Sequence, residues 1–473
     1  MSELRKTISP AALTALGAAG VIGSSWLYLG GDFFKSFGAG GTILGFLLAT
    51  LLAASVALAY AELASAMPRA GGEIVYGYVA AGRYPSFIVG WLLIGAYVGM
   101  VGFYVTATGR LLSAVWPQLE SLPLYELGGG TIYLPVLAIG VGLTLVMLAI
   151  NWYGAGLSSK TQLVLFVCMA LLALVVAGTG FVAGSADNLF PMFDTAVTGD
   201  ASPVVLSLMF MLPAFSFLTG FGVVAVMAEE ARATPAQIGR IVVISVLLAG
   251  AFYTIVLAAT GWLLPWQEVA GMSNGTIEAF EVAGYHAISM AAFAIGVLGL
   301  LTTFLAVFGA ASRLMLALAR IQMLPERFGS VDEQTKTPRF ALAFTAVVGV
   351  LLGMLGPSAI LWFLNTGGIY IGVVWGFTVF AMYRIRRKYP HMIRSRGWVR
   401  TWIPALGVLA ALGVVAVALI PGTPLALRWP YEYMIVGGWV LLGTVLFVLS
   451  PRRMTREEGL DALLGEHRAQ LER

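Results

Sequence analysis

The chain has 473 residues, of which 59% are hydrophobic and only 11% are charged, and its mean hydropathy is +0.90. Soluble globular proteins carry about 25% charged residues, so this composition excludes a soluble fold and indicates a polytopic protein whose main partner is the lipid bilayer. The net charge of +4 is explained by topology and contact with anionic lipid, and no nucleic acid partner is expected. The single cysteine, Cys168, allows no internal disulfide.

Twelve apolar runs follow one another along the chain, each long enough for a helix to cross the hydrocarbon, which takes about 20 residues. The runs are continuous and lack the alternation of barrel strands. They predict an all-α membrane protein with helices over residues 9–35, 40–66, 84–115, 132–152, 158–184, 203–228, 238–264, 283–319, 339–356, 358–383, 401–420 and 431–450.

Basic residues predict the orientation of these spans. With the N-terminus in the cytoplasm, all but three of the 27 Lys and Arg residues fall on the inner side, the exceptions being Lys35, Arg110 and Arg428. This distribution follows the positive-inside rule. We therefore expect a multi-pass protein of the cytoplasmic membrane with both termini inside: residues 1–8 form a short segment that is retained and not cleaved, and residues 451–473 form a tail.

The first predicted span is interrupted in its middle by small residues, at Gly17, Gly20, Gly23 and Ser24. A break at membrane depth leaves backbone groups where no water can satisfy them, so it persists only where it lines a cavity or a ligand. The amides of residues 22–25 would be free there, and the helix that follows would direct the positive end of its dipole at a carboxylate. This interruption is a candidate binding site.

A similar interruption falls in the sixth span, at residues 217–222. Carbonyl groups of residues 215–218 would be free to accept from an ammonium group. Interruptions at corresponding places in two halves point to the substrate site of a transporter built from inverted repeats, and the two together would fit the backbone of an amino acid. The alternative is that these glycines only allow close helix packing.

Charged side chains are absent from the middle of every predicted span. Because such a residue costs about 2.5–3.5 kcal/mol to insert, its absence argues against a proton relay through carboxylates. No catalytic motif of the His-Glu-x-x-His or Gly-x-Ser-x-Gly type occurs, so neither an enzyme nor a resident cofactor is expected. Glu62, Glu229 and Glu230 fall at inner ends, where salt bridges with Arg69 or Arg232 would form an inner gate.

Arg110 is the one charge that does not fall at a membrane edge. It precedes Trp116, which is read as an interface anchor, by six residues, or about 9 Å along a helix. An arginine there could bind an acidic substrate side chain. The alternative is that it reaches the outer interface or pairs with an acid of an outer loop.

Four sets of motifs, in order along the chain, carry a resemblance to a known family. They are Ile22-Gly23-Ser24 in the first span; Ala61-Glu62-Leu63-Ala64, Met67-Pro68-Arg69-Ala70-Gly71-Gly72 and Val75-Tyr76 after the second; Gly220-Phe221, Ala228-Glu229-Glu230 and Thr234-Pro235 in and after the sixth; and Ala319-Arg320, Met323-Leu324-Pro325 and Thr337-Pro338 after the eighth. The chain resembles permeases of the amino acid-polyamine-organocation (APC) superfamily over about residues 5–390. The resemblance implies a leucine-transporter-like inverted repeat, residues 9–184 and 203–383, followed by two further helices within residues 401–450. It also implies alternating access and an amino acid or related amine as substrate.

The resemblance also assigns roles to the two interruptions. Ile22, Gly23, Ser24 and Ser25 resemble the turn that binds the substrate carboxylate. Phe215, Phe217, Thr219 and Gly220 resemble the segment that binds the amino group, with Phe217 and Phe221 as aromatic gates and Glu62 and Arg69 as inner-gate residues. The chain departs from the family pattern in having one extra residue before Gly220, and in having Gly222 where an acid often follows Gly-Phe.

Coupling to an ion is predicted from the same comparison. Proton-coupled relatives carry a lysine midway along the fifth span, and the corresponding place here is near Met169. Sodium-coupled relatives of the fold have a hydroxyl pair on span eight, to which Thr302 and Thr303 correspond, and carbonyls of Ala19 and Ile22 would complete a site for a hard monovalent cation. The alternatives are that the threonines bond back to their own helix, and that the protein is a sodium-independent exchanger.

The sequence thus predicts a secondary transporter of amino acids. Neutral substrates are favoured because no buried acid is found to pair with a cationic one, and Asn365 of the tenth span is a candidate for contact with the substrate side chain. Alternatives are a transporter of acidic amino acids and a sensor of the same fold that does not transport. The oligomeric state stays open.

Overall fold

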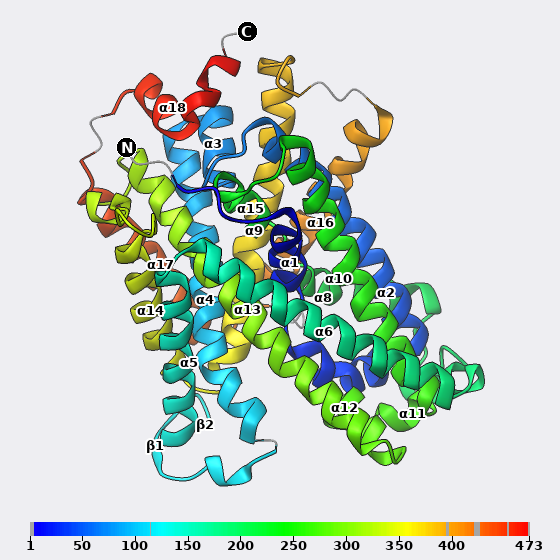
Figure 1. Ribbon diagram of the computed structural model, residues 1–473. Helices are drawn as coiled ribbons and strands as arrows, with labels where there is room; N and C mark the ends of the chain where they lie inside the picture. Colours follow the sequence, from blue (N-terminus) through cyan, green and yellow to red (C-terminus); the bar gives the residue numbers. More distant parts are fainter. Residues whose placement is uncertain (1–3, 114, 394–396, 421–425, 452–453, 472–473) are drawn as a thin grey trace.

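The structure is a computed structural model that describes residues 4–113, 115–393, 397–420, 426–451 and 454–471 (Figure 1). Within these ranges it is a bundle of helices with one small hairpin. The helices are α1 (Pro10–Val21), α2 (Ser25–Ala66), α3 (Glu73–Ala81), α4 (Arg83–Ser113), α5 (Leu134–Trp152), α6 (Ala155–Ala183), α7 (Thr195–Thr198), α8 (Pro203–Phe217), α9 (Val223–Val226), α10 (Pro235–Leu263), α11 (Trp266–Val269), α12 (Gly275–Val282), α13 (His286–Arg320), α14 (Arg339–Gly353), α15 (Ala359–Lys388), α16 (Trp398–Leu419), α17 (Tyr431–Val448) and α18 (Arg456–Leu464).

Nine helices of the described residues are long and apolar enough to cross a membrane, and α1, α8 and α14 are shorter apolar helices. The predicted spans therefore correspond to helices, with two changes. The first and sixth runs are broken, and the second half of the first run is joined to the second run within α2. The join is a kink at Gly38, whose φ of 71° and ψ of 170° are not helical. Glycine accepts this backbone conformation because it has no Cβ.

The all-α prediction misses one element. Strands β1 (Pro123–Leu127) and β2 (Gly130–Tyr133) form an antiparallel hairpin in the connection that follows α4. Its turn residues, Gly128 and Gly129, both have positive φ, at 59° and 81°. Two such residues are typical of a tight hairpin turn, so the signal was the run of three glycines at residues 128–130.

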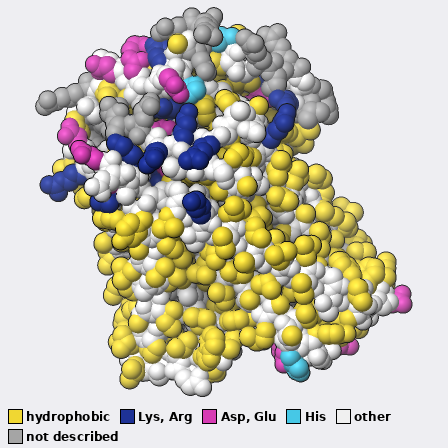
Figure 2. Space-filling model, in the orientation of Figure 1, with side chains coloured by type: hydrophobic (Ala, Val, Ile, Leu, Met, Phe, Trp, Pro, Cys, Tyr) yellow, Lys and Arg dark blue, Asp and Glu magenta, His cyan; other side chains and the backbone are white. Residues whose placement is uncertain are grey.

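The two ends of the bundle differ in chemistry. We call the end that holds both chain termini, α3 and α18 the terminal end, and the end that holds β1, β2 and α12 the hairpin end (Figure 1). Figure 2 shows that Lys and Arg side chains gather on the terminal end, while hydrophobic side chains cover most of the visible face below them. A hydrophobic band beside a basic end is the distribution expected of a protein that crosses a membrane.

Both chain ends are fixed to the terminal end by backbone contacts. The amides of Thr7 and Ile8 donate to the carbonyl of Glu230 at 2.9 and 3.0 Å, and the amide of Arg232 donates to Ile8 at 2.8 Å. In the tail, Thr455 and Glu458 form a capping box at the start of α18. The carbonyl of Leu463 accepts from Nε of Arg69 at 2.9 Å, so the tail packs on the connection between α2 and α3.

Candidate functional site

The first predicted interruption is confirmed. α1 ends at Val21 and α2 begins at Ser25, which leaves residues 22–24 outside both helices. The amide of Gly23 turns back to the carbonyl of Val21 at 2.9 Å. Because the first amides of a helix have no partner within it, the amide of Ser25, at the start of α2, points out of the helix into this break.

The second predicted interruption is also confirmed. α8 ends at Phe217, and the helical backbone resumes only at Val223 in the short α9. Gly220 has a φ of 112°, which an L-residue with a side chain rarely adopts. Pro213 lies one turn before the end of α8 and removes a backbone hydrogen bond there.

The last turn of α1, which leads into the first break, is in direct contact with the second break. A Cβ atom on Gly220 would lie 2.3 Å from the carbonyl oxygen of Gly20, and a Cβ atom on Gly20 would lie 3.6 Å from the carbonyl oxygen of Gly220. A side chain at position 220 would strain the backbone at this φ and would also clash with the carbonyl oxygen of Gly20, so residue 220 must be glycine. Because these segments meet, bare peptide groups of two distant parts of the chain face one another inside the bundle.

Tyr253 of α10 holds the two breaks together. Its buried hydroxyl donates to the carbonyl of Val21 at 2.8 Å and lies 3.3 Å from the carbonyl oxygen of Phe217. A third wall comes from α4, where the hydroxyl of Tyr104 would lie 3.4 Å from a Cβ atom on Gly23. Sequence reasoning missed both tyrosines, although a phenol within an apolar span is itself a weak signal because its hydroxyl needs a partner.

The candidate ion ligands are brought together in part. The hydroxyl of Thr303 lies 3.0 Å from the carbonyl oxygen of Ala19 and 3.1 Å from that of Ile22. Thr302 instead donates to Gly299 of its own helix at 3.0 Å, which is the alternative considered for the pair. Three oxygens, from Ala19, Ile22 and Thr303, therefore fit the donor chemistry of a hard cation.

The aromatic residues assigned to gates lie on opposite sides of the breaks. Phe217 packs edge-on against Phe33 and Phe46, with ring centroids 5.7 and 6.2 Å apart. These two residues flank the kink of α2 at Gly38, on the way to the hairpin end. Phe221 packs against Tyr60 at 5.2 Å, in the part of α2 that returns to the terminal end. Their roles as outer and inner gates stay predictions.

Three further predicted site residues lie in or beside the breaks but differ in their burial and contacts: Phe215, Thr219 and Ser24. Phe215 is buried against Trp375 of α15, with ring centroids 4.7 Å apart, whereas Thr219 is half-buried within the second break. Ser24 is buried and precedes α2, but its side chain makes no capping hydrogen bond.

The side chain of Asn365, a candidate for contact with the substrate, is hydrogen-bonded to a buried acid. Its side-chain amide donates to Oε1 of Glu432 at 2.8 Å, and Glu432 is fully buried at the start of α17. The other oxygen of Glu432 accepts from the backbone amide of Arg428 at 2.6 Å. Asn365 thus satisfies a buried carboxylate between α15 and α17, a partner that its sequence position could not reveal.

Arg110 lies away from the two breaks. It is exposed and lines a cavity of about 230 Å³ near β2, together with Glu120 and Thr131. This position favours the second interpretation of Arg110, in which its charge remains at the hairpin end of the bundle.

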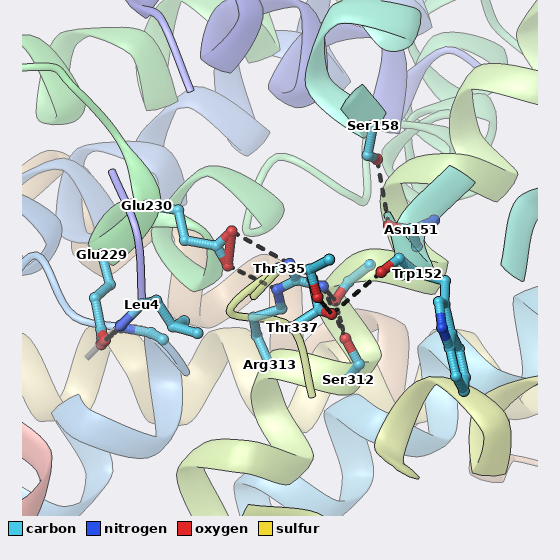
Figure 3. Close-up of polar contacts among 12 residues, drawn as sticks. Leu4, Asn151, Trp152, Ser158, Glu229, Glu230, Ser312, Arg313, Thr335 and Thr337 are labelled. Atoms are coloured by element: carbon cyan, nitrogen blue, oxygen red, sulfur yellow. Dashed lines mark hydrogen bonds and ion pairs between the residues drawn. The ribbon is translucent and has the colours of Figure 1, made fainter. Parts of the chain in front are cut away.

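Salt bridges lie at the terminal end of the bundle, next to the segment that follows the second break. Glu229 accepts from both terminal nitrogens of Arg320 at 2.8 and 2.9 Å, and Nε of Arg69 lies 3.5 Å from it. The amide of Leu4 also donates to Glu229, at 3.1 Å (Figure 3). Burial alone would raise the pKa of Glu229, but the hydrogen bonds and charge of Arg320 and the charge of Arg69 hold it at about 2.

The neighbouring acid forms a second buried pair. Glu230 binds Nε and Nη2 of Arg313 at 2.8 and 3.2 Å (Figure 3), and the arginine is fully buried in α13. Sequence reasoning missed Arg313 although it lies within the predicted span 283–319. Arg232 does not join this pair, because its Nε donates to the carbonyl of Lys6.

The predicted gate residues Glu62 and Arg69 have different partners from each other. Glu62 forms an ion pair with Arg386 of α15 at 2.5 Å, and Arg69 contacts Glu229 as described above. Glu62 therefore links α2 to α15, whereas Arg69 links the α2–α3 connection to the segment after α9.

The expectation that no buried acid lies near the breaks is wrong. Glu73, the first residue of α3, is 1% exposed. Burial raises its pKa to about 7. The sequence hides this residue because it falls between two apolar runs, in a stretch where an acid is normally hydrated.

A helical bundle with two broken helices in contact, a hydrophobic surface and one basic end defines a polytopic membrane protein of the transporter type. The sequence profile of the amino acid permease family matches residues 8–441, and the chain belongs to this family, within the APC superfamily.

Named relatives span most of the chain. The branched-chain amino acid permease BcaP of Bacillus subtilis is 25% identical over 464 residues, covering 96% of this chain and 95% of the relative. The methylthioribose transporter of Bacillus subtilis is 24% identical, covering 95% and 94%. Cationic amino acid transporter 4 of Mus musculus is 26% identical, covering 77% of this chain and 58% of the relative.

Proposed function

We propose that this protein is a secondary transporter that moves amino acids across the cytoplasmic membrane by alternating access, with the terminal end in the cytoplasm. The contact between the end of α1, beside the first break, and the second break, where Gly20 meets Gly220, is the observation that carries the proposal. Broken helices at membrane depth are typical of substrate sites in secondary transporters. The basic terminal end supports the orientation.

The substrate backbone would bind between the breaks. Its carboxylate would accept from the amides around Ser24 and Ser25, where α2 begins and the helix dipole is positive. Its ammonium group would donate to carbonyl oxygens of the second break near Phe217. The carbonyl that Tyr253 contacts keeps a second lone pair for this role.

Neutral amino acids are the favoured substrates. The residues that form the two breaks, 22–24 and 218–222, carry no charge, and Arg110 lies apart from them. The similarity to BcaP, whose name specifies branched-chain amino acids, makes leucine, isoleucine and valine the first compounds to test. The differently named methylthioribose and cationic amino acid transporters mean that family membership alone does not choose the substrate.

Alternating access would follow from an inverted repeat, with residues 9–184 and 203–383 as its halves and the helices within 401–450 added to it. Each half begins with a broken helix, α1 and α2 in one and α8 and α9 in the other. Phe217 toward the hairpin end and the Glu229–Arg320 bridge toward the terminal end would be the closures of the two routes to the site.

Sodium is the coupling ion that the first break suggests. The carbonyls of Ala19 and Ile22 and the hydroxyl of Thr303 would hold it. Such a cation would be transported with the amino acid and would link α1 to α13 while bound.

Flux through purified protein in liposomes tests the function. We expect radiolabelled leucine, isoleucine or valine to exchange against the same unlabelled amino acid inside the vesicles, and to accumulate when a sodium gradient is imposed. Binding of an amino acid, seen as a rise in melting temperature, without exchange in any condition would favour the sensor alternative. Exchange without gradient-driven accumulation would favour the sodium-independent exchanger.

A further inference from the structure

We propose that Glu73 is a proton-binding site beside the second helix break, and that transport carries this proton along with the amino acid. The inference rests on the proposed transport function and adds a second ion to it, at a place separate from Ala19, Ile22 and Thr303.

The backbone brings Glu73 directly against the α8–α9 segment. The amide of Gly71 donates to the carbonyl of Val226 at 3.2 Å. A Cβ atom on Gly72 would lie 3.1 Å from the carbonyl carbon of Ala225, so the connection before α3 can only approach α9 this closely because it is made of glycines. The next residue, Glu73, is thereby directed at the break.

The carboxyl group occupies the space beside Gly222, the last residue of the second break. Its Oε1 atom would lie 2.8 Å from a Cβ atom on residue 222. A side chain at position 222 would therefore displace Glu73. The acid that the family pattern places at 222 is missing, and a carboxyl from another part of the chain fills its space.

Among the residues that the structure describes, no Lys or Arg forms an ion pair with Glu73. Both of its oxygens are buried without a hydrogen-bond partner in the described structure. The groups that face it are phenols: Tyr60 from α2, Tyr97 from α4 and Tyr76 from α3 itself.

In the described part of the chain, the remaining elements packed around this carboxyl contribute no charged group to it. From α15 the polar group is the hydroxyl of Thr378, 3.5 Å from the Tyr60 hydroxyl. From α13 the residue that faces the connection is Ala317, 2.3 Å from a Cβ atom on Gly71. An ionised carboxylate is costly in such a place, and the shift in its pKa agrees with this.

A proton is the ligand that fits this place. A Cβ atom on residue 222 would lie 2.8 Å from the carboxyl, 3.4 Å from the Tyr60 ring and 3.5 Å from the Tyr97 hydroxyl, so little space is left beside the carboxyl. An ammonium or guanidinium group would need this backbone to move, whereas a proton adds no volume.

The chemistry of one cycle is a single reversible ionisation. When α9 separates from α3 and the terminal end opens, water reaches Glu73, the O–H bond breaks, the proton passes to water and the carboxylate stays on the protein. The reverse step belongs to the other half of the cycle: while the hairpin end is open, water that enters from that side gives a proton to the carboxylate and the O–H bond forms again, so one proton crosses per cycle. The position of Glu73, between the breaks and the Glu229–Arg320 bridge, makes ionisation depend on which side is open.

Proton movement can be measured directly in proteoliposomes that contain a pH-sensitive dye. With equal sodium concentrations on both sides of vesicles that contain no amino acid, net entry of the amino acid that gives the greatest exchange in the test of function should acidify the lumen. An inward gradient of one pH unit should sustain about tenfold accumulation at one proton per substrate. Net uptake of this amino acid by wild-type protein without acidification of the lumen would overturn the proposal, and so would exchange with no net uptake when an inward proton gradient is imposed.

Variants assign the proton to Glu73. Glu73→Gln, which imitates the protonated side chain, should keep exchange but lose acidification and accumulation, and Glu73→Asp should keep both with a shifted pH dependence. The control Glu126→Gln, on the exposed hairpin, should behave as wild type. Acidification by Glu73→Gln equal to wild type would place the proton elsewhere and reject the inference.

The same experiment also distinguishes two other outcomes: a Glu73→Gln variant that does not fold, and a wild-type protein that transports no amino acid. If Glu73→Gln does not fold, the wild-type acidification and the pH dependence of Glu73→Asp decide the question. If wild-type protein exchanges no amino acid in any condition, the proposed transport function fails, and this outcome differs from exchange without proton movement.

Discussion

The hydroxyl of Thr303 lies 3.0 Å from the carbonyl oxygen of Ala19. This contact joins the middle of α13 to the last turn of α1, and Ile22 adds a second carbonyl at 3.1 Å. Gly299 permits the approach, since a Cβ atom there would lie 2.6 Å from the carbonyl oxygen of Gly23. The hydroxyl therefore sits where it can either donate to the break or, turned around, share a cation with it.

Replacing Thr303 distinguishes these two roles. We expect Thr303→Ala to abolish the sodium dependence of uptake and Thr303→Ser to retain it, because serine keeps the hydroxyl oxygen. The measurement is initial uptake against sodium concentration in proteoliposomes. Thr302→Ala is the matched control, since Thr302 bonds only to Gly299 in its own helix, and its sodium dependence should equal that of wild type. Uptake that never depended on sodium would remove the sodium proposal.

Replacing Tyr253 tests whether the two breaks act as one site. Tyr253→Phe removes the hydroxyl that contacts Val21 and Phe217, and a hydrogen bond of this kind contributes about 0.5–1.5 kcal/mol. We therefore expect the half-saturating substrate concentration to rise by roughly 2- to 13-fold. Tyr370→Phe is the control, because the buried Tyr370 hydroxyl has no hydrogen-bond partner in the described structure. Equal effects of the two substitutions would count against the proposed role of Tyr253.

The local pattern of the sequence was enough to predict the spans and both breaks. Twelve apolar runs and two clusters of small residues are properties of neighbouring positions, and the backbone conformation at Gly220 follows from them. The contacts that hold the site together depend on distant positions. Nothing near Tyr253 in the sequence indicates that it contacts Val21, and nothing near Arg313 indicates that it pairs with Glu230. Residue types alone therefore predicted the site but not the side chains that stabilise it.

Asn365 and Glu73 show why side-chain roles were harder to predict. Asn365 was named as a candidate for the substrate side chain, whereas its side-chain amide donates to Glu432. Glu73 was not considered because it lies between two spans. The glycines before it allow the connection to approach α9 closely, and this places Glu73 beside the second break. In both cases the deciding fact is which helix packs against the residue.

Replacing Asn365 should affect folding but not substrate binding. Asn365→Ala leaves the buried Glu432 with one hydrogen bond fewer, and an unsatisfied buried group costs about 1–3 kcal/mol. We expect a lower melting temperature with an unchanged half-saturating substrate concentration. Thr444→Ala on the exposed side of α17 serves as the control for stability. A large loss of substrate affinity in Asn365→Ala would restore the original assignment.

Removing one partner of the Glu229 salt bridge should strongly destabilise the protein. Arg320→Met leaves the carboxylate of Glu229 buried with Arg69 at 3.5 Å, and breaking a buried pair on one side costs about 3–5 kcal/mol. The check is thermal or denaturant unfolding in detergent. Replacing Arg468, which pairs with exposed acids of the tail, should change stability far less, as surface pairs contribute about 0–1 kcal/mol.

The same bridge sets a limit on acid stability. The folded protein holds the pKa of Glu229 at about 2, below its ordinary value of 4.5. A carboxyl whose pKa is lowered by folding contributes stability above the unfolded pKa, and this contribution is lost as pH falls through the folded pKa. We expect the difference in melting temperature between wild type and Glu229→Gln to shrink between pH 4.5 and the lowest pH at which the protein stays soluble. A constant difference over that range would contradict the pairing.

Glu73 should show the opposite dependence on pH. Its pKa is raised by folding from 4.5 to about 7, so between these values the folded chain keeps a proton that the unfolded chain has released. Because the folded state then binds more protons, stability falls as pH rises. The loss begins near pH 4.5 and is complete above about pH 7, and it amounts to roughly 3 kcal/mol.

Glu73→Gln cannot ionise, so its melting temperature relative to wild type should be lowest near pH 4.5 and should rise until pH 7. Glu126→Gln, an exposed acid changed in the same way, should show no such trend, and a flat difference for Glu73→Gln would mean that the carboxyl is ionised inside the folded protein.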